Sequence, residues 1–447
     1  MKHYAPLLLL LFSLSARVQS QSVVPLLDSV VQVYFKQNKF NGSVLVAQKG
    51  KILLEKGYGY KDVASKTKAD ANSLYQYGSV TKQFTSALVM YLQEKGKLRV
   101  QDKLSKYFPD LPFADSVTLY NLLTHTSGIY NYTENRDFMK NDAVKPTTQE
   151  KMLALFRDKP LAFQPGSKFS YSNSNYMLLG YIIEKTSGMP YEQLARKVIL
   201  QPLGMKTAGF DFAHNTSADR TTGYDMIEVE QAAKAGIVDS SVSYAAGSLY
   251  GSVKDLYAWH QALEKGALLS AASWKQVYTP FRSKYGFGWG IDTLFGHPVV
   301  QHNGGIFGYT SVIKRLPQDD VVVIVLSNNS SPRVEDMANN LLAALYQQPL
   351  NLPKEKVAIK LPEEKLKPFV GEYELHPGFS VLLRLENGVL KIKPTGQDEK
   401  ELSAESETDF FLPSEDIDIH FEKNGNGEVT GFRLKLGGGE MQAKKIK

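Results

Sequence analysis

The spacing of apolar residues changes twice along this chain, and these changes constrain the fold more than any other feature of the sequence. Runs with strand character occupy residues 42–48 and 51–60, on either side of a tight turn at Lys49-Gly50. Helical spacing takes over from about residue 79 to 230, and strand-like runs return between 285 and 328. If early and late strands share one sheet, the helical block must lie beside it. This order indicates an α+β fold with an antiparallel sheet and an all-helical subdomain.

Helices are also expected at both ends of this region. Apolar residues recur at helical spacing between residues 26 and 35, and a second helix is predicted from about 334 to 346. These terminal helices can cover the sheet, which leaves a cleft where the sheet and the helical block meet. The other predicted helices are 80–96, 118–125, 174–188 and 252–266, and the late strands are 285–292, 297–305, 309–316 and 321–328.

The pattern changes again near the C-terminus. Residues 347–366 are rich in Pro, Lys and Glu and are predicted to form a linker. Residues 367–447 contain short strands separated by Gly, Asn and Asp turns, with no helical spacing. We therefore expect a large domain over 21–346, followed by a small all-β accessory domain that forms a barrel or a sandwich.

The first twenty residues have the pattern of a secretory signal peptide. A basic start is followed by a short apolar run and then by small and polar residues near Ser20. The apolar run is too short to span a bilayer, and no later run reaches the length of about 20 apolar residues that a spanning helix needs. Cysteine is absent, which excludes disulfides, thiolate metal sites and a lipidated cysteine. The sequence predicts a periplasmic or secreted protein with no membrane span.

Charge and composition limit the classes of partner that the sequence allows. The formal net charge is +6, but the Lys and Arg residues are scattered rather than gathered into a basic stripe, which argues against nucleic acid. The sequence implies no metal and no organic cofactor. The expected partner is a small-molecule or peptide substrate; the sequence leaves the oligomeric state open, with a monomer as the default.

Three S-x-x-K pairs are the first candidates for chemistry. Ser65 lies in a polar loop, and Ser311 lies in a strand, where residues three apart face opposite sides. Only Ser79 opens a predicted helix, where residues three apart share a face and Lys82 can reach the serine hydroxyl. The helix start also supplies free N–H groups for a developing oxyanion. The alternative is that Ser79 is an ordinary helix cap and Lys82 a solvated charge.

Two further segments contain groups that can assist such a serine. "FSYSNSNY" places Tyr171 and Asn173 just before an apolar helix, although a turn with a surface tyrosine explains the same residues. "VVQHNGGIFGY" carries His302 before Gly304 and Gly305, and these glycines allow a ligand to approach the strand closely. The alternative there is a hairpin turn with an incidental histidine.

Together, S-x-x-K, Y-S-N and H-x-G resemble the signature of the penicillin-recognising serine hydrolases. The likeness is greatest to the group that contains the class C β-lactamases, the D-alanyl-D-alanine carboxypeptidases, D-peptidases and esterases. Supporting matches are "LLTHTSGI", "QPGSKFSYSNSNYMLLGYIIEKTSGMPY", "PLGM", "AAGSLYGSVKDLYAW" and "YGFGWG". The resemblance covers about residues 24–346 and implies a β-lactamase/transpeptidase-like fold. The C-terminal β domain resembles a domain appended to many β-lactamase-related proteins.

The resemblance also implies a role for each residue. Ser79 would form the acyl-enzyme, Lys82 would share or relay its proton, and Tyr171 would act as base and then as acid. In the same way, Asn173 would hold the substrate amide, His302 would occupy the place of the lysine in K-T-G, and the N–H groups of Ser79 and Gly305 would form the oxyanion hole. Tyr130 and Tyr132 are candidate pocket residues.

The chain has His302-Asn303-Gly304 where the β-lactamases have K-T-G. A histidine with a pKa near 6.5 is mostly neutral at neutral pH, so the fixed cation for a substrate carboxylate is missing. This favours an exported D-alanyl-D-alanine carboxypeptidase-like or D-peptidase-like hydrolase over an efficient β-lactamase. The alternatives are an esterase of the same family and a sensor that binds β-lactams or peptides without hydrolysing them.

Overall fold

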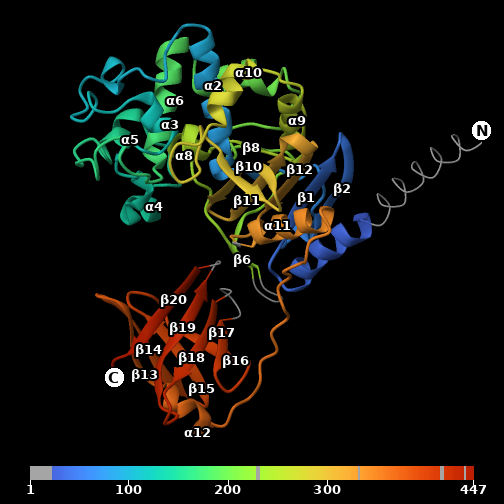
Figure 1. Ribbon diagram of the computed structural model, residues 1–447, viewed down its shortest axis with the longest axis vertical. Helices are drawn as coiled ribbons and strands as arrows, with labels where there is room; N and C mark the ends of the chain where they lie inside the picture. Colours follow the sequence, from blue (N-terminus) through green and yellow to red (C-terminus); the bar gives the residue numbers. More distant parts are fainter. Residues whose placement is uncertain (1–22, 228–231, 331–332, 413–416, 437–438) are drawn as a thin grey trace, which may run out of the picture. The chain divides into compact units, whose positions relative to one another are not determined.

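The computed structural model describes residues 23–227, 232–330, 333–412, 417–436 and 439–447. The predicted signal peptide, 1–20, lies outside the described residues. The chain divides into two compact units, of which the first ends at Leu352 and the second begins at Pro353 (Figure 1).

A six-stranded antiparallel sheet forms the framework of the first unit, in the order β2-β1-β12-β11-β10-β9. The earliest strands therefore pair with the latest one, which brings the two ends of this unit into one sheet. Lys49 and Gly50 both have positive φ angles, 51° and 70°, which suit the tight turn between β1 and β2. The strands are β1 (Gly42–Gln48), β2 (Lys51–Tyr58), β9 (Gly290–Leu294), β10 (His297–Ile306), β11 (Tyr309–Leu316) and β12 (Val321–Ser327).

Both faces of the central strands are buried, which explains the continuous apolar run of β12. Val321, Val323 and Val325 pack with the helix of residues 23–36 and with α11 (Val334–Leu345). Val322, Ile324 and Leu326 point to the other face and join a larger core that includes α9 (Val253–Glu264). The two terminal helices thus cover one side of the sheet, and the helical block lies on the other (Figure 1).

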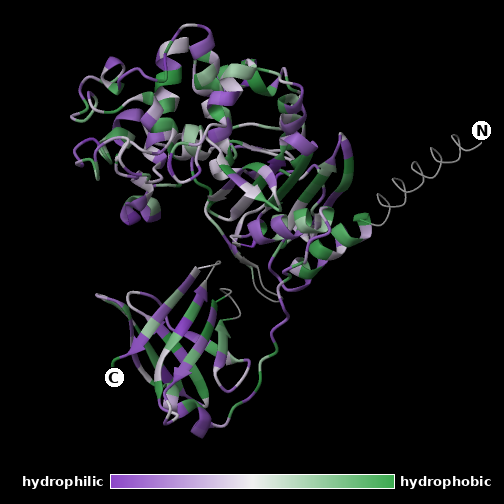
Figure 2. Cartoon of the chain, in the orientation of Figure 1, coloured by the Kyte–Doolittle hydropathy of each residue, from purple (hydrophilic) through white to green (hydrophobic). Residues whose placement is uncertain are grey.

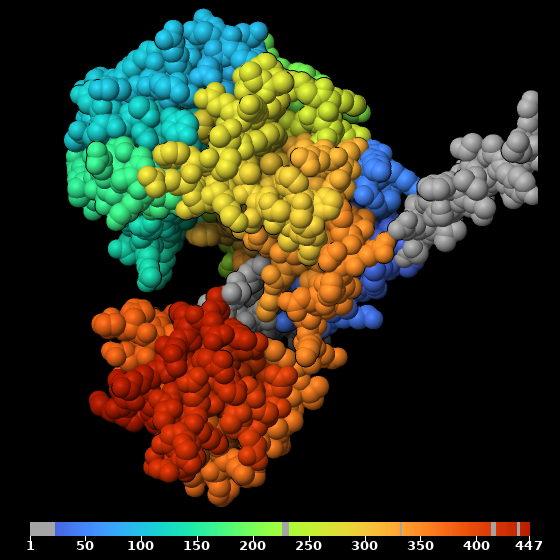
Figure 3. All heavy atoms as spheres, in the orientation of Figure 1, coloured from blue at the N-terminus to red at the C-terminus, as the bar shows by residue number. Residues whose placement is uncertain are grey.

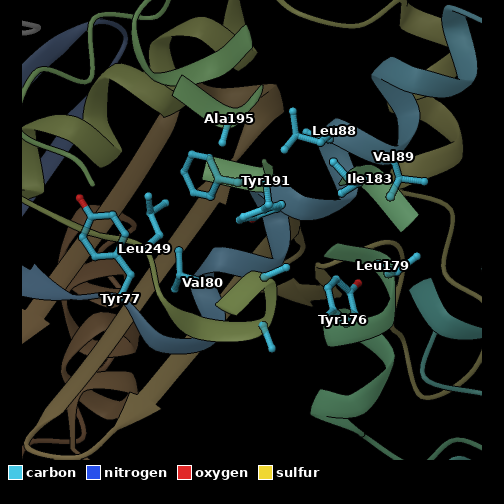
Figure 4. Packing of buried hydrophobic residues seen from close by; sticks show 14 of the residues in the cluster. Tyr77, Val80, Leu88, Val89, Tyr176, Leu179, Ile183, Tyr191, Ala195 and Leu249 are labelled. Atoms are coloured by element: carbon cyan, nitrogen blue, oxygen red, sulfur yellow. The ribbon is translucent and has the colours of Figure 1, made fainter. Parts of the chain in front are cut away.

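The helical block is built around α2 (Thr81–Glu94), which follows a short 3-10 turn, and α6 (Asn173–Ser187). Figure 4 shows apolar side chains from these two helices and from the next short helix facing one another. The helix α6 ends at Gly188, whose φ of 69° gives a left-handed cap. The remaining helices are α3 (Leu119–Leu123), α4 (Arg136–Asn141), α5 (Gln149–Ala154), α7 (Tyr191–Ala195), α8 (Ser240–Gly247) and α10 (Ala271–Val277). In Figure 3 the helical block, in cyan and green, forms one continuous surface with the later yellow segment.

Two details differ from the predictions. The strand expected over 285–292 begins only at Gly290, because the preceding residues turn tightly against α2: Gly288 has a φ of 74°, and a Cβ there would lie 2.5 Å from the Lys82 carbonyl oxygen. The block from 79 to 230 also contains strand β6 (Tyr224–Ile227), which pairs with β7 (Ala232–Lys234). Two-stranded pairs β3 (Tyr60–Asp62) with β4 (Thr67–Lys68), and β5 (Tyr75–Gln76) with β8 (Tyr250–Gly251), complete this unit.

The second unit is a closed eight-stranded antiparallel barrel, one of the two β architectures predicted. Its strands alternate apolar and polar residues, visible as green and purple stretches in Figure 2, so that one set fills the interior. A short helix, α12 (Glu363–Leu366), contributes Leu366 to this interior, so the barrel unit begins within the predicted linker. The strands are β13 (Gly371–His376), β14 (Phe379–Glu386), β15 (Val389–Pro394), β16 (Lys400–Ala404), β17 (Asp409–Leu412), β18 (Ile417–Lys423), β19 (Val429–Leu436) and β20 (Gly439–Lys445).

None of the helices in the described ranges combines the length and the apolar character needed to cross a bilayer.

Candidate active site

Ser79 lies in the 3-10 turn Gly78–Val80, directly before α2. No side chain caps either this turn or α2, so Ser79 is not the ordinary cap that was the alternative interpretation. Its hydroxyl oxygen instead accepts a hydrogen bond from the Lys82 amine, at 3.0 Å. The serine side chain is therefore committed to the lysine rather than to the helix backbone.

Lys82 is fully buried and lies at the centre of a small polar network. Its Nζ lies 2.8 Å from the Asn173 Oδ1 atom and 2.8 Å from the Ala246 carbonyl oxygen, in addition to the Ser79 hydroxyl. Burial lowers the pKa of Lys82 well below its ordinary value.

The identity of these partners gives the neutral amine a defined orientation. A carbonyl oxygen can only accept hydrogen bonds, and so can the Asn173 Oδ1 atom, whose amide Nδ2 donates to the Thr133 hydroxyl at 3.2 Å. A neutral amine has two N–H donors and one lone pair. When the two donors serve Asn173 and Ala246, the lone pair faces the hydroxyl of Ser79. The sequence-predicted Ser79, Lys82 and Asn173 are thus brought together in an arrangement that can remove the serine proton.

The Ala246 carbonyl reaches Lys82 through a strained turn inside α8. Tyr244 has φ 36° and ψ −133°, which is unfavourable for a residue with a side chain. The next two carbonyl groups point at α2: Ala245 accepts from the Thr85 hydroxyl at 2.6 Å, and Ala246 accepts from Lys82. The strained turn therefore orients the carbonyl group that holds Lys82.

Tyr171 lies beside this network. Its ring centroid is 4.9 Å from the Lys82 Nζ atom, and the ring packs on His125 with centroids 4.1 Å apart. Although part of its surface is exposed, the enclosed setting raises the pKa of Tyr171 above its ordinary value, and a hydrogen bond with Ser79 opposes that rise. The phenol consequently keeps its proton at neutral pH.

His125 also belongs to the site, although the sequence analysis did not single it out. Its carbonyl oxygen accepts from the Ser170 N–H at 2.9 Å, and its Nδ1 atom accepts from the Ser172 N–H at 3.2 Å. Both neighbours of Tyr171 are thereby held while the His125 ring packs on Tyr171 itself. His125 has a φ of 53°. The only sequence signal was its place in "LLTHTSGI", which carries no spacing that predicts such a contact.

His302 lies on β10 and is 6% exposed. Its Nδ1 atom donates to the Asn303 carbonyl oxygen at 2.5 Å, so Nε2 accepts from the Tyr285 hydroxyl at 2.8 Å. Burial, with a smaller contribution from the charge of Lys82, lowers the pKa of His302 to about 3. The imidazole is therefore neutral, and both of its nitrogens are already bonded within the protein. Tyr285 was not singled out from the sequence.

Gly304 lets β10 approach the turn that carries Ser79. A Cβ at Gly304 would lie 2.0 Å from the Tyr77 carbonyl oxygen and 3.1 Å from the Ser79 nitrogen. The neighbouring Gly305 lies against Gly78. The Ser311 hydroxyl donates to the same Tyr77 carbonyl at 2.7 Å and secures the turn from β11. Close packing at this glycine therefore places the backbone of Gly305 beside that of Ser79.

A cavity of about 410 Å³ opens beside Ser79. Its walls include Asn173 and Gly305 together with Tyr132, one of the two predicted pocket tyrosines; Tyr130 is not among its lining residues. Most of the wall is apolar. The apolar lining side chains are Met139, Val238, Val242, Ala246, Ile306 and Phe307.

The other two S-x-x-K pairs are separated, as predicted. The Ser65 hydroxyl contacts Thr67, and Lys68 lies over the Tyr60 ring. Lys314 forms an ion pair with Glu335 of α11. It therefore lies on the opposite face of the sheet from Ser311, whose hydroxyl donates to the Tyr77 carbonyl oxygen.

One group of metal-ligand side chains lies elsewhere in the described ranges. His260, Glu264 and Asp320 place potential ligand atoms within 4.8 Å of one another. The guanidinium of Arg315 occupies this cluster, because it donates to the His260 Nδ1 atom at 3.0 Å and pairs with Glu264. A cation would have to displace a buried arginine, so this network is structural.

Comparison with known proteins agrees with this geometry. The family model described as Beta-lactamase matches residues 27–348, and a model described as a domain of unknown function, DUF3471, matches 355–446. Penicillin-binding protein 4* of Bacillus subtilis is 29% identical over 94% of this chain and 98% of its own length. The putative penicillin-binding protein PbpX of Bacillus subtilis is 32% identical over 70% of this chain and 78% of its own length.

A solved structure shows the same architecture. The octameric penicillin-binding protein homologue from Pyrococcus abyssi is 27% identical, with a TM-score of 0.66 over 94% of this chain and all of its own. Sheet, helical block, serine–lysine pair and sequence matches all agree, and the chain belongs to the Beta-lactamase family.

Proposed function

We propose that this protein is an exported serine hydrolase that forms an acyl-enzyme at Ser79 with peptide or ester substrates. The observation that carries the proposal is the buried Lys82 amine, 3.0 Å from the Ser79 hydroxyl, with two other partners that can only accept hydrogen bonds. A serine hydroxyl needs such a neighbour to become nucleophilic.

In the first step the Ser79 oxygen bonds to the substrate carbonyl carbon while its proton passes to the neutral Lys82 amine. We assign this role to Lys82 rather than to Tyr171, because the raised pKa of Tyr171 keeps its phenol protonated. Because its pKa is lowered, Lys82 is neutral at pH values at which an ordinary lysine is charged. The N–H groups of Ser79 and Gly305 would hold the oxyanion, a contribution of about 10²–10³ in rate for one donor in other hydrolases.

In the second step the bond to the leaving group breaks. Tyr171, which retains its proton because of its raised pKa, donates it to the leaving nitrogen or oxygen and is reprotonated from the Lys82 ammonium. The Lys82 amine is then neutral again. Hydrolysis of the acyl-enzyme repeats these proton transfers. Lys82 removes a proton from the attacking water, and the Ser79 oxygen leaves with a proton returned through the same groups. Asn173 would orient both Lys82 and the substrate amide.

The neutral state of His302 supports peptide or ester hydrolysis over efficient β-lactam hydrolysis, because it offers no fixed cation to a substrate carboxylate. Within this class we favour a D-peptidase related to the D-alanyl-D-alanine carboxypeptidases, consistent with relatives that are named penicillin-binding proteins. An esterase of the same family, or a sensor that binds without turnover, is the alternative. The signal-peptide pattern of residues 1–20 supports export to the periplasm or the medium.

Turnover by Ser79→Ala and Ser65→Ala variants tests the proposal. Ser65 belongs to an S-x-x-K pair outside the site and provides a matched control. With a panel of D- and L-peptides, p-nitrophenyl esters and a penicillin, Ser79→Ala should lose activity on every substrate that the parent cleaves, and Ser65→Ala should retain it. Full turnover by Ser79→Ala would refute the proposal, while stoichiometric acylation without product would favour the sensor.

A further inference from the structure

The cavity beside Ser79 carries an unbalanced charge. Among its described lining residues Asp225 is the one ionisable carboxylate, and none is Lys, Arg or His. We propose that this cavity selects substrates with a protonated amino group, held by Asp225, and disfavours substrates with a free carboxylate. The inference rests on the proposed function and narrows it: among D-peptidases it favours those that act on substrates with a free amino group over carboxypeptidases, whose substrates end in a free carboxylate.

Neither Lys82 nor His302 offers a free positive charge to an anionic substrate. The three hydrogen-bonding positions of Lys82 are directed at Ser79, Asn173 and Ala246. His302 is neutral, and its nitrogens are bonded to Tyr285 and Asn303. Arg220 and Lys234 line a second pocket that shares Tyr309, but neither belongs to the wall of this cavity. A carboxylate bound in the cavity would therefore meet the charge of Asp225 with no cation among the described lining residues.

Asp225 is exposed and available. Within the described part of the chain it forms no salt bridge or side-chain hydrogen bond, although surface carboxylates of this protein commonly pair with lysine. Its position is fixed through its neighbour Tyr224, whose N–H donates to the Asn328 carbonyl at 3.0 Å and whose carbonyl accepts from the Ser330 N–H at 3.0 Å. The strand thus holds Asp225 at the cavity wall, and no side chain of the described residues is paired with its carboxylate.

The rest of the wall fits the remainder of such a substrate. Met139, Val242, Ile306 and Phe307 can surround an apolar side chain, and their burial of that side chain would supply much of the binding free energy. Because Asp225 is exposed, solvent screens its charge, and we expect it to discriminate between substrates by up to about fivefold rather than by orders of magnitude.

The test compares three competitors that differ in charge. Acylation of the full chain by p-nitrophenyl acetate is followed with D-leucinamide, which is cationic, N-acetyl-D-leucinamide, which is neutral, and N-acetyl-D-leucine, which is anionic. The inhibition constants are measured for the parent, for Asp225→Asn and for Asp137→Asn. Asp137 is an exposed carboxylate on α4, the helix that also carries the lining residue Met139, and it is not part of the cavity wall.

In the parent, D-leucinamide should compete best and N-acetyl-D-leucine worst. Asp225→Asn should weaken D-leucinamide by up to about fivefold, leave the neutral competitor unchanged and improve the anionic one, whereas Asp137→Asn should match the parent. An order of affinities that Asp225→Asn leaves unchanged, or a preference of the parent for the anion, would overturn the inference while Ser79 still acylates. Absence of acylation at Ser79 would overturn the proposed function, and this inference with it.

Discussion

Both units of this protein have apolar cores, but only the first also buries polar and charged side chains among the described residues. In the first, buried side chains include Lys82, His125, His302 and Arg315, each enclosed by polar or aromatic partners. In the barrel, the buried side chains of the described residues are all apolar or aromatic. A buried polar group costs free energy unless it is bonded, so a structure retains such groups where they have a use. The difference locates the chemistry in the first unit and gives the barrel interior the simpler task of stabilising a shape.

The largest effect is expected when the polar centre of the first unit is made apolar. Lys82→Met removes the amine that faces Ser79, so kcat/KM should fall by at least about 10³-fold. Ester hydrolysis measured beside thermal unfolding separates this loss from misfolding. Ser65→Ala serves as the unaffected control, and a Lys82→Met protein that is folded and fully active would show that another group removes the serine proton.

The barrel should respond to a core truncation through its stability alone. Phe421 is 1% exposed and packs against four aromatic rings, including Phe369 with centroids 4.3 Å apart. Phe421→Ala should lower the free energy of unfolding of the barrel by about 3–5 kcal/mol. Denaturant unfolding with a probe in each unit measures this. Loss of Ser79 acylation in native conditions would contradict the separation of roles.

Acid should destabilise the first unit through its buried histidines. The pKa values of His260 and His302 are lowered by burial to about 3, whereas the unfolded chain takes up these protons near pH 6.5. The unfolded state therefore binds more protons between these values, and stability falls with decreasing pH by about 1.4 kcal/mol per pH unit for each histidine. Unfolding between pH 6.5 and 5, before most carboxylates titrate, checks this. His302→Asn should reduce the slope, and a flat profile in the parent would refute the account.

A smaller effect is expected from the residue that holds Tyr171. His125→Phe keeps a ring against Tyr171 but removes the acceptor for the Ser172 N–H. We expect kcat to fall about tenfold, because the tyrosine loses orientation. His125→Asn keeps an acceptor and tolerates the positive φ, so it should recover part of the loss. Equal losses in both variants, with KM raised and kcat unchanged, would argue against a positioning role.

Periodic features could be predicted from the sequence, and contacts between distant segments could not. Helical spacing brought Lys82, on α2, within reach of Ser79 in the turn before it, and short strands separated by turns predicted an all-β second unit, either a barrel or a sandwich. The Lys82 contact with Ala246 depends on a strained turn at Tyr244, which no periodicity encodes. For the same reason Tyr285, His125 and Asp225 were missed as site residues: each meets its neighbours only through the tertiary fold.

The most direct test of the central claim is an intact-mass time course of the mature protein with p-nitrophenyl acetate, followed by peptide mapping. Ser79→Ala and Lys82→Met are run beside the parent. The account predicts one acetyl group on Ser79 of the parent, none on Ser79→Ala and greatly slowed acetylation of Lys82→Met. Acetylation of the parent at another residue, or equal rates in the parent and in Lys82→Met, would contradict the claim that the buried lysine makes Ser79 a nucleophile.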